Sequence, residues 1–206
     1  MEQITTTIIS LTAFITAVAT LIVNIVKAKK EIENSLPKKV KDQSSINIEI
    51  NSRLEYLKEF SGADRVQIYD FHNGGHYANG RSALKTSCSY EVLRAGVKGH
   101  QKELQSVPLS CIPVFIRTLL DKGELKINDL EQLKEIMPAT YELKKSQGVM
   151  SFYDIILNNK FGEPIGFLAL QYCKKDSVNF TKEDINQILK LKFFIEENLE
   201  KMANGK

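Results

Sequence analysis

The chain has 206 residues, of which 43% are hydrophobic and 26% are charged, a composition that is ordinary for a folded globular protein. Its net charge of +3 comes mainly from lysines between residues 27 and 41, so nothing indicates a basic nucleic-acid-binding face on a folded domain. The cysteines lack a C-x-x-C pair or metal-type spacing, which argues against a metal site or redox pair; we expect reduced, structural thiols. They are Cys88, Cys111 and Cys173.

Residues Thr7 to Val26 carry no charge and end abruptly at Lys27. A helix of about twenty such residues, at about 1.5 Å per residue, spans the hydrocarbon core of a bilayer. We therefore predict that residues 1–26 are a single transmembrane anchor. A cleaved signal peptide would need basic residues before its apolar core, whereas here they follow it. A helix lying in the headgroups would need a charged face, which this segment lacks.

Several lysines follow the uncharged segment directly, whereas only Glu2 precedes it. The positive-inside rule then predicts a single-pass protein of the inner, cytoplasmic membrane with its C-terminal domain in the cytoplasm. Residues 27–45 are polar and interrupted by Pro37, so we interpret them as a basic juxtamembrane linker with some helix at its start. The lysines either contact membrane lipid headgroups or act only as a stop-transfer signal in a solvated linker.

A soluble domain is predicted from residue 46 to residue 206. It opens with a helix, because apolar residues recur at helical spacing until Gly62. Arg65 to Phe71 alternates as a strand does, and it runs into His72 to His76, which read HNGGH. Adjacent glycines permit backbone conformations closed to other residues, so we expect a tight turn or an ordered loop there.

The middle of the chain is less regular. Ser87 to Leu93 fits either a second strand or the start of a helix. Residues 112–120 then predict a short helix, residues 125–128 a strand, and residues 130–137 another helix.

The last part of the chain gives the clearest pattern. Two apolar runs, residues 150–157 and 165–172, are separated by a polar turn, which predicts an antiparallel hairpin. Thr181 then begins a helix whose capping-box partner is Asp184, three residues on. Apolar residues at helical spacing follow it to Leu199.

Three short segments resemble a GAF domain: Ser146 to Ser151 (SQGVMS), Gly162 to Leu170 (GEPIGFLAL) and Phe180 to Asp184 (FTKED). The resemblance covers residues 46–203 and is strongest after Gly148. It implies an α+β fold, with an antiparallel sheet whose terminal helices pack on one face and often pair across a homodimer. It also implies a small-molecule pocket on the other face, closed by loops and short helices.

Some GAF domains that bind cyclic nucleotides carry a dispersed signature, and Asn159, Lys160, Phe161, Phe180 and Asp184 stand here in the corresponding order. The sequence departs from the signature at its last position, which is not glutamate. The resemblance implies a structural clamp, a salt bridge between Lys160 and Asp184. A chance match competes, since each piece is common in hairpin turns and capped helices.

The HNGGH segment resembles that of GAF-like domains in membrane-anchored bacterial or phage-encoded proteins. Metal binding is disfavoured, because the two glycines between the histidines oppose a helix. The segment either hydrogen-bonds an anionic or carbonyl-bearing ligand, approached closely by backbone amides, or forms a plain turn. The candidate ligand-binding residues are His72, Asn73, Gly74, Gly75, His76 and Tyr90.

No nucleophile, base and orienting group can be named together, so we expect no catalytic site and no enzyme activity. The sequence identifies no cofactor. Two hypotheses remain. The first is a membrane-anchored module that senses a small molecule and signals through dimerisation or a partner. The second is a membrane-tethered structural or protein-interaction module without a ligand.

Overall fold

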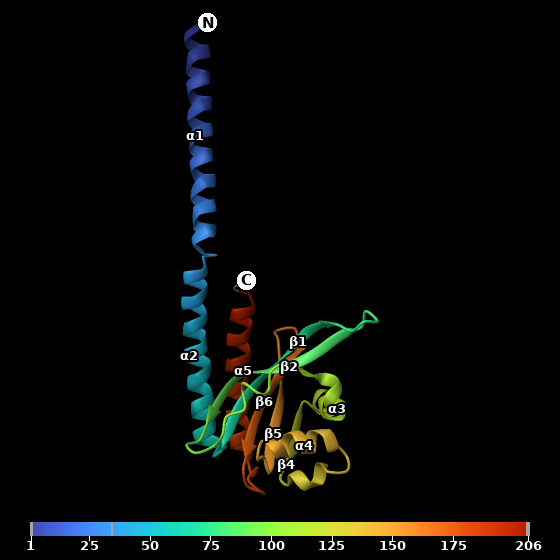
Figure 1. Cartoon of the computed structure of the whole chain (residues 1–206). Helices are drawn as coiled ribbons and strands as arrows, with labels where there is room; N and C mark the ends of the chain where they lie inside the picture. The colour runs from blue at the N-terminus through green and yellow to red at the C-terminus, as the bar shows by residue number, and fades with distance from the viewer. Residues whose placement is uncertain (1, 34, 205–206) are drawn as a thin grey trace. The chain divides into compact units, whose positions relative to one another are not determined.

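The computed structural model describes the backbone of residues 2–33 and 35–204. The chain divides into two compact units, one reaching to Ile46 and the other running from Asn47 to Asn204. The first unit holds helix α1 (Glu2–Glu33) and the start of helix α2 (Leu36–Ser61) (Figure 1). Pro37 lies in the first turn of α2, where its missing N–H costs no helical hydrogen bond.

Within the residues that the structure describes, no helix combines the length and the apolar character needed to cross a membrane. The described residues therefore do not support the transmembrane helix predicted at residues 1–26, and the side chains of residues 1–13 lie outside the part of the chain that the structure describes. The location predicted from the lysine positions stays a prediction.

The second unit is built on a six-stranded sheet with the strand order β3-β2-β1-β6-β5-β4. Every neighbouring pair of strands is antiparallel. The predicted hairpin is confirmed, since β5 and β6 pair in register along almost their whole length. The strands are β1 (Arg65–His76), β2 (Ser82–Leu93), β3 (Val107–Pro108), β4 (Glu124–Ile127), β5 (Ser151–Asn158) and β6 (Pro164–Tyr172).

The helices of this unit differ from the sequence prediction in the middle of the chain. Residues 130–137 form only the short 3-10 helix η2 (Leu130–Leu133), and a separate helix, α4 (Pro138–Ser146), follows. Pro138 sits in the first turn of α4, so it starts a new helix where one continuous helix would have needed its N–H. The others are η1 (Leu109–Cys111), α3 (Pro113–Lys122) and α5 (Lys182–Asn204).

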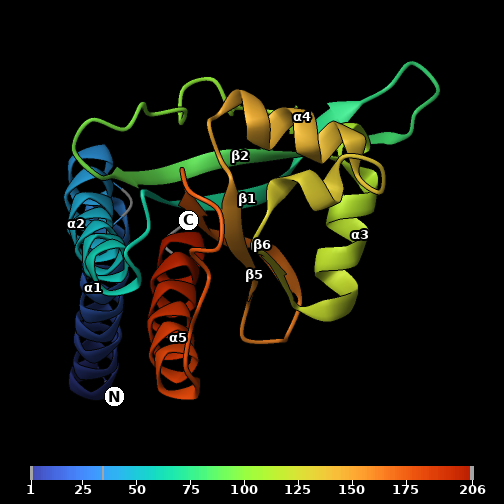
Figure 2. The same ribbon diagram turned by 90° about the horizontal axis from the view of Figure 1, so that it is seen from below.

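The sheet is covered on both faces, as the α+β prediction requires. Helices α2 and α5 lie side by side on one face, and α3 and α4 lie on the other (Figure 2). The guanidinium carbon of Arg53 on α2 lies 4.4 Å from the centre of the Phe194 ring on α5, which ties the two helices together. Because successive strand residues point to opposite faces, each central strand buries side chains in both layers. Strand β5 is accordingly buried from Ser151 to Leu157.

The predicted clamp between Lys160 and Asp184 is wrong. Lys160 Nζ lies 2.7 Å from Glu200 Oε1, near the other end of α5. Asp184 Oδ2 instead accepts hydrogen bonds from the backbone N–H and the hydroxyl of Thr181, both at 2.9 Å. The Asp184 N–H donates back to Thr181 Oγ1, so the predicted capping box is confirmed. Asp184 is therefore engaged in capping its own helix, and Lys160 pairs with Glu200 instead.

We expect Thr181→Ala to lower the free energy of unfolding by about 1 kcal/mol, because it removes the hydroxyl of the helix cap. Lys160→Ala is the control, since an exposed ion pair contributes only about 0.5 kcal/mol or less. Urea denaturation of both variants measures the difference. A loss in Lys160→Ala that equals or exceeds the loss in Thr181→Ala would contradict this account of the terminal helix.

Candidate functional site

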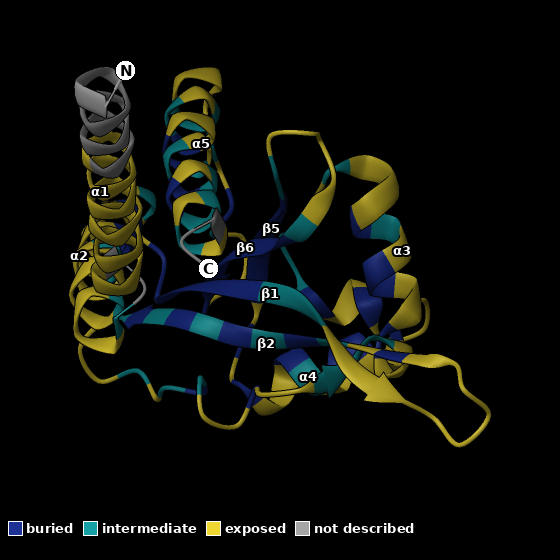
Figure 3. Ribbon diagram, turned by 90° about the horizontal axis from the view of Figure 1, so that it is seen from above, coloured by how far each residue is buried: buried dark blue, intermediate teal, exposed yellow. Residues whose placement is uncertain are grey.

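The HNGGH segment is not the tight turn predicted from its glycines. Strand β1 continues through it to His76, paired with β2, and the chain turns later, between Tyr77 and Arg81. The β1–β2 hairpin therefore extends beyond the rest of the sheet as an arm whose residues 73–82 are exposed (Figure 3). Strand β6 pairs with β1 only as far as Asp70.

Most of the predicted ligand-binding residues lie along this arm. His72 Nε2 shares a hydrogen bond of 2.9 Å with Ser87 Oγ on β2. Asn73 Oδ1 accepts a hydrogen bond from the Gly75 N–H, and Gly75 has a φ of +102° that favours glycine. A methyl group at Gly74 would lie 2.4 Å from Cδ of Lys85, so this glycine gives the lysine side chain room to cross it. His76 is exposed.

Tyr90 lies elsewhere, on the face of the sheet covered by α2 and α5. Its hydroxyl donates to Asn47 Oδ1 at 2.5 Å and also contacts Met202 Sδ at 3.4 Å. The structure therefore does not bring Tyr90 together with the arm residues into one pocket. The proposed ligand contacts of all six residues stay predictions, and the arm presents them on an open hairpin.

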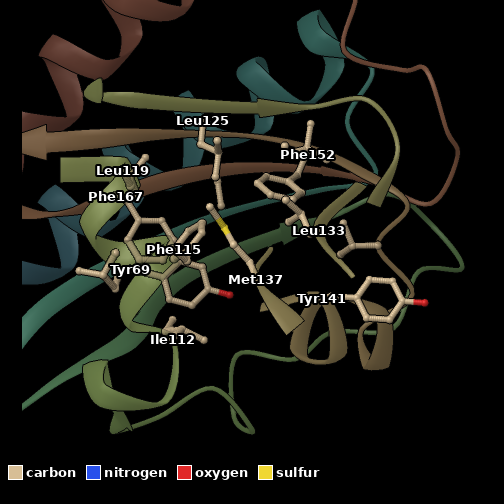
Figure 4. Packing of buried hydrophobic residues seen from close by; sticks show 14 of the residues in the cluster. Tyr69, Ile112, Phe115, Leu119, Leu125, Leu133, Met137, Tyr141, Phe152 and Phe167 are labelled. Carbon is tan, nitrogen blue, oxygen red and sulfur yellow. The ribbon is translucent and has the colours of Figure 1, made fainter. Parts of the chain in front are cut away.

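The face beneath α3 and α4 holds a large hydrophobic cluster (Figure 4). The Tyr69 ring stacks on the Phe167 ring with centroids 4.5 Å apart, and the Phe115 ring meets Phe167 edge-on at 5.6 Å. Met137 and Tyr141 come from the segment between η2 and α4 and from α4 itself, and they close the cluster. The GAF resemblance placed a small-molecule pocket on this face, and in this structure side chains fill it.

A row of polar side chains crosses the same face. We define the polar stripe as Glu91, Gln67, Asp154, Arg65 and Gln171. Strand register aligns the first three across β2, β1 and β5, with the small Ala169 of β6 between Gln67 and Asp154. All the members are buried or nearly so, and charged residues are seldom fully buried unless they are paired. Their partners therefore decide what the face can bind.

Arg65 is the centre of the stripe, with only 2% of its surface exposed. Its guanidinium donates to Gln171 Oε1 at 2.8 Å, to the carbonyl oxygen of Lys98 at 2.7 Å and, more weakly, to that of Gln147 at 3.3 Å. Its Nε lies 3.5 Å from Glu91 Oε1. One side chain therefore joins β1, β6, β2, the end of α4 and the segment after β2.

We call that segment, residues 94–106, the strap. The Glu91 carboxylate accepts hydrogen bonds from the backbone N–H groups of His100 and Gln101, at 2.9 to 3.1 Å. The side-chain amides of Gln101 and Gln105 donate to backbone carbonyls of β2 at 2.6 and 2.7 Å. The strap is thus held to the sheet by polar contacts, and the stripe supplies two of its anchors, Arg65 and Glu91.

Lys144 of α4 reaches the other end of the stripe. Its Nζ lies 2.7 Å from Asp154 Oδ2, with side-chain exposures of 7% for the lysine and 0% for the aspartate. Burial lowers the pKa of Lys144, although the Asp154 charge opposes that shift. Burial also raises the pKa of Asp154, against the opposing effect of Lys144. Both shifts favour the neutral forms of the pair.

Four buried polar atoms at this site have no hydrogen-bond partner within the described part of the chain: Arg65 Nε, Gln147 Oε1, Asp154 Oδ1 and Gln171 Nε2. A buried polar atom left without a partner costs about 1–3 kcal/mol. Two of these atoms are donors and two are acceptors. A molecule, or ordered water, that offers both kinds of group would satisfy these atoms.

No motif in the sequence marks this site, although the strands that form it carry a signal. Arg65, Gln67 and Tyr69 alternate with Val66 and Ile68, so a polar face was readable along β1. Asp154 and Gln171 each interrupt an otherwise apolar strand. Lys144 and Gln147 carry no such signal, because their place over the stripe depends on how α4 packs.

No protein-family model and no curated protein matches the sequence. Solved structures match the fold. The PixJ GAF domain of Thermosynechococcus elongatus in its blue-light-absorbing form is 12% identical, with a TM-score of 0.59 over 83% of this chain and 95% of its own. A phycoerythrobilin-bound GAF domain from a cyanobacterial phytochrome is 17% identical, with a TM-score of 0.53 over 82% of this chain and 97% of its own.

A third match is the GAF domain region of a Geobacter sulfurreducens PCA protein, which is 15% identical with a TM-score of 0.55. It covers 78% of this chain and 97% of its own. At these identities the matches show the fold alone. The second unit therefore has a GAF-like fold, as the sequence resemblance implied.

The pKa of Tyr90 allows a test of how its side chain is buried on the face covered by α2 and α5. Burial raises the pKa of Tyr90 to about 12, so its neutral form stabilises the folded state up to about pH 10 and this contribution is lost as the pH rises toward about 12. We expect the free energy of unfolding of Tyr90→Phe to fall less steeply across this range than that of the wild type. Urea titrations at successive alkaline pH values measure it, with the exposed Tyr56→Phe as control. Equal slopes for the wild type and Tyr90→Phe would overturn the prediction.

Proposed function

We propose that this chain is a sensory module that binds a small molecule on the polar stripe, beneath α4 and the strap. The proposed ligand is partly flat and carries both hydrogen-bond donors and acceptors. The observation that carries the proposal is the set of four buried polar atoms without hydrogen-bond partners, since a bound molecule that satisfies them removes a cost that the free protein bears. The GAF-like fold is consistent with this role but does not identify the ligand.

A ligand can reach the stripe only if α4 and the strap, which cover it, move away from the sheet. Both segments have features that would permit such a movement. Helix α4 begins at Pro138, and Gly148 follows its C-terminal end. Gly148 has a φ of +72°, which marks a change of backbone direction after the helix. The strap is held by hydrogen bonds, which solvent can replace during opening, and by one apolar anchor, Leu104, which is buried in the hydrophobic cluster. We propose that ligand binding holds these two segments closed.

The output of such a module would leave through the opposite face. Helices α2 and α5 are tied to the sheet through Tyr90, Asn47 and Met202. On α5, Leu189 is 42% exposed and Phe193 is 62% exposed, which offers apolar area to a second copy or to a partner. We propose that a ligand-dependent shift of these helices changes dimerisation or partner binding, as two states with different ligand affinity require.

The same exposed face supports the alternative function, a protein-interaction module without a ligand. In that case the filled face beneath α4 would be a purely structural core. The two functions differ in what the purified protein carries. Native mass spectrometry of the full chain in a detergent-containing buffer tests this directly: a bound small molecule supports the sensor, and a ligand-free assembly that forms through α5 supports the interaction module.

We expect Gln147→Met to raise the free energy of unfolding of the ligand-free protein by about 1 kcal/mol, because it replaces a buried oxygen that lacks a partner. The backbone carbonyl that Arg65 uses stays in place. The same variant should weaken retention of any molecule bound at the stripe. Denaturation and native mass spectrometry measure the two effects.

Gln132→Met is the matched control, because Gln132 is exposed and the chemical change is the same. We expect it to leave both quantities unchanged. If Gln147→Met destabilises the ligand-free protein, or retains a bound molecule as well as the wild type does, the amide oxygen is not a ligand-binding group and the proposed site fails at this position.

A further inference from the structure

Lys144 is unusual because its primary amine is buried beside one carboxylate and two aromatic rings. Its Nζ lies 4.2 Å from the centre of the Phe152 ring and 5.7 Å from that of Phe115, in addition to the 2.7 Å contact with Asp154 Oδ2. The second oxygen of Asp154 is buried and has no hydrogen-bond partner within the described residues. An amine, an acid with a free oxygen and two rings therefore face one another.

We propose that Lys144 is a covalent attachment site, whose ε-amino group forms an imine with a flat aromatic aldehyde. The inference rests on the proposed function, because the aldehyde occupies the same stripe beneath α4. It adds the chemical class of the ligand and the atom to which it is joined. The aromatic class follows from Phe152 and Phe115, which provide ring faces beside the reacting nitrogen.

The protonation of the pair suits this chemistry. Imine formation needs a neutral amine as nucleophile and an acid that can protonate the departing oxygen. Burial lowers the pKa of Lys144 and raises the pKa of Asp154, so both shifts move the proton from Nζ toward the carboxylate. Lysines that form Schiff bases are commonly activated by desolvation of this kind.

The reaction balances without any other reactant. The lone pair of Lys144 Nζ attacks the carbonyl carbon, a C–N bond forms, and the carbonyl oxygen takes the proton of Asp154 to give a carbinolamine. Asp154 takes a proton from the nitrogen and returns it to the hydroxyl group, the C–O bond breaks, and water leaves as the C=N bond forms. The aldehyde and the amine thus give an imine and one water, and a protonated imine keeps Asp154 as its counter-ion.

The next residue provides a natural comparison. Lys145 is exposed, and its Nζ lies 2.8 Å from the Tyr141 hydroxyl, a hydrogen bond that raises the pKa of this lysine. The two lysines are adjacent on the same helix but have opposite environments. Each difference of one pKa unit changes the fraction of neutral amine about tenfold, so Lys144 should react faster once α4 admits the aldehyde.

The test uses the full chain with benzaldehyde as probe, followed by borohydride reduction, which converts an imine into a stable benzylamine. Peptide mapping by mass spectrometry then locates the benzyl group. We expect Lys144 to be labelled faster than Lys145 or any other lysine, because burial lowers the pKa of Lys144 and favours its neutral, nucleophilic form. Lys144→Arg keeps a cation beside Asp154 but cannot form an imine, so it should lose this label. The matched variant Lys145→Arg should keep it.

Labelling spread over exposed lysines, with Lys144 no faster than Lys145, would overturn the inference, and so would an absence of label at Lys144. The wild-type map decides this even if Lys144→Arg fails to fold. A thermal shift with benzyl alcohol, which lacks the aldehyde, separates the two proposals. A shift without Lys144 labelling keeps the ligand site and rejects covalent attachment, whereas site-specific labelling supports both.

Discussion

The buried guanidinium of Arg65 is the contact on which the rest of this face depends. It bonds to a side chain of β6 and to backbone carbonyls of the strap and of the residue after α4. Glu91, the nearest carboxylate, also holds the strap through backbone N–H groups. Removing one partner of a buried charge pair leaves the other uncompensated, at a cost of about 3–5 kcal/mol. The cover and the sheet are therefore joined by charge, and the apolar cluster beside them adds stability.

The features that the sequence predicted correctly are those set by residues close together in the chain. The β5–β6 hairpin follows from two apolar runs around a polar turn, and the Thr181 and Asp184 capping box follows from residues three apart. The HNGGH segment misled because glycines also occur within strands: Gly74 is needed for the crossing of Lys85, and the turn uses Gly80 instead. The α-helical reading of residues 130–137 failed because Pro138 begins a separate helix.

The candidate site lay beyond sequence reasoning for a different reason. Its members are far apart in the chain, and the register of four strands brings Glu91, Gln67 and Asp154 into one row. The polar positions in β1 and β5 were visible, but their partners Lys144 and Gln147 sit on a helix whose packing no short pattern fixes. Lys160 shows the same limit, because its carboxylate partner lies forty residues on, at Glu200.

Strand β1 gives the two faces a physical connection. Tyr69 and Arg65 point toward α4, while Val66 and Ile68, on alternate positions, point toward α2 and α5. The pairing of β1 with β2 shifts between Ile68 and Tyr69, next to Tyr90, whose hydroxyl reaches both terminal helices. A bulge is a place where a strand can bend, so under the proposed function a ligand that displaced Arg65 would act on the segment that carries the contacts to the helices.

Two groups of buried residues have opposite effects on the closure of α4 and the strap over the sheet. The apolar cluster favours closure with or without a ligand, whereas the partnerless atoms and the buried Lys144 and Asp154 pair oppose it. A molecule shifts an equilibrium only by the difference in its affinity for the two states. In the proposed opening of α4 and the strap, these polar atoms would be desolvated only in the closed state, so a ligand that satisfies them would gain its extra free energy there. Under the proposed function, the buried polarity that weakens the empty closed form would therefore make closure more favourable when a molecule is bound.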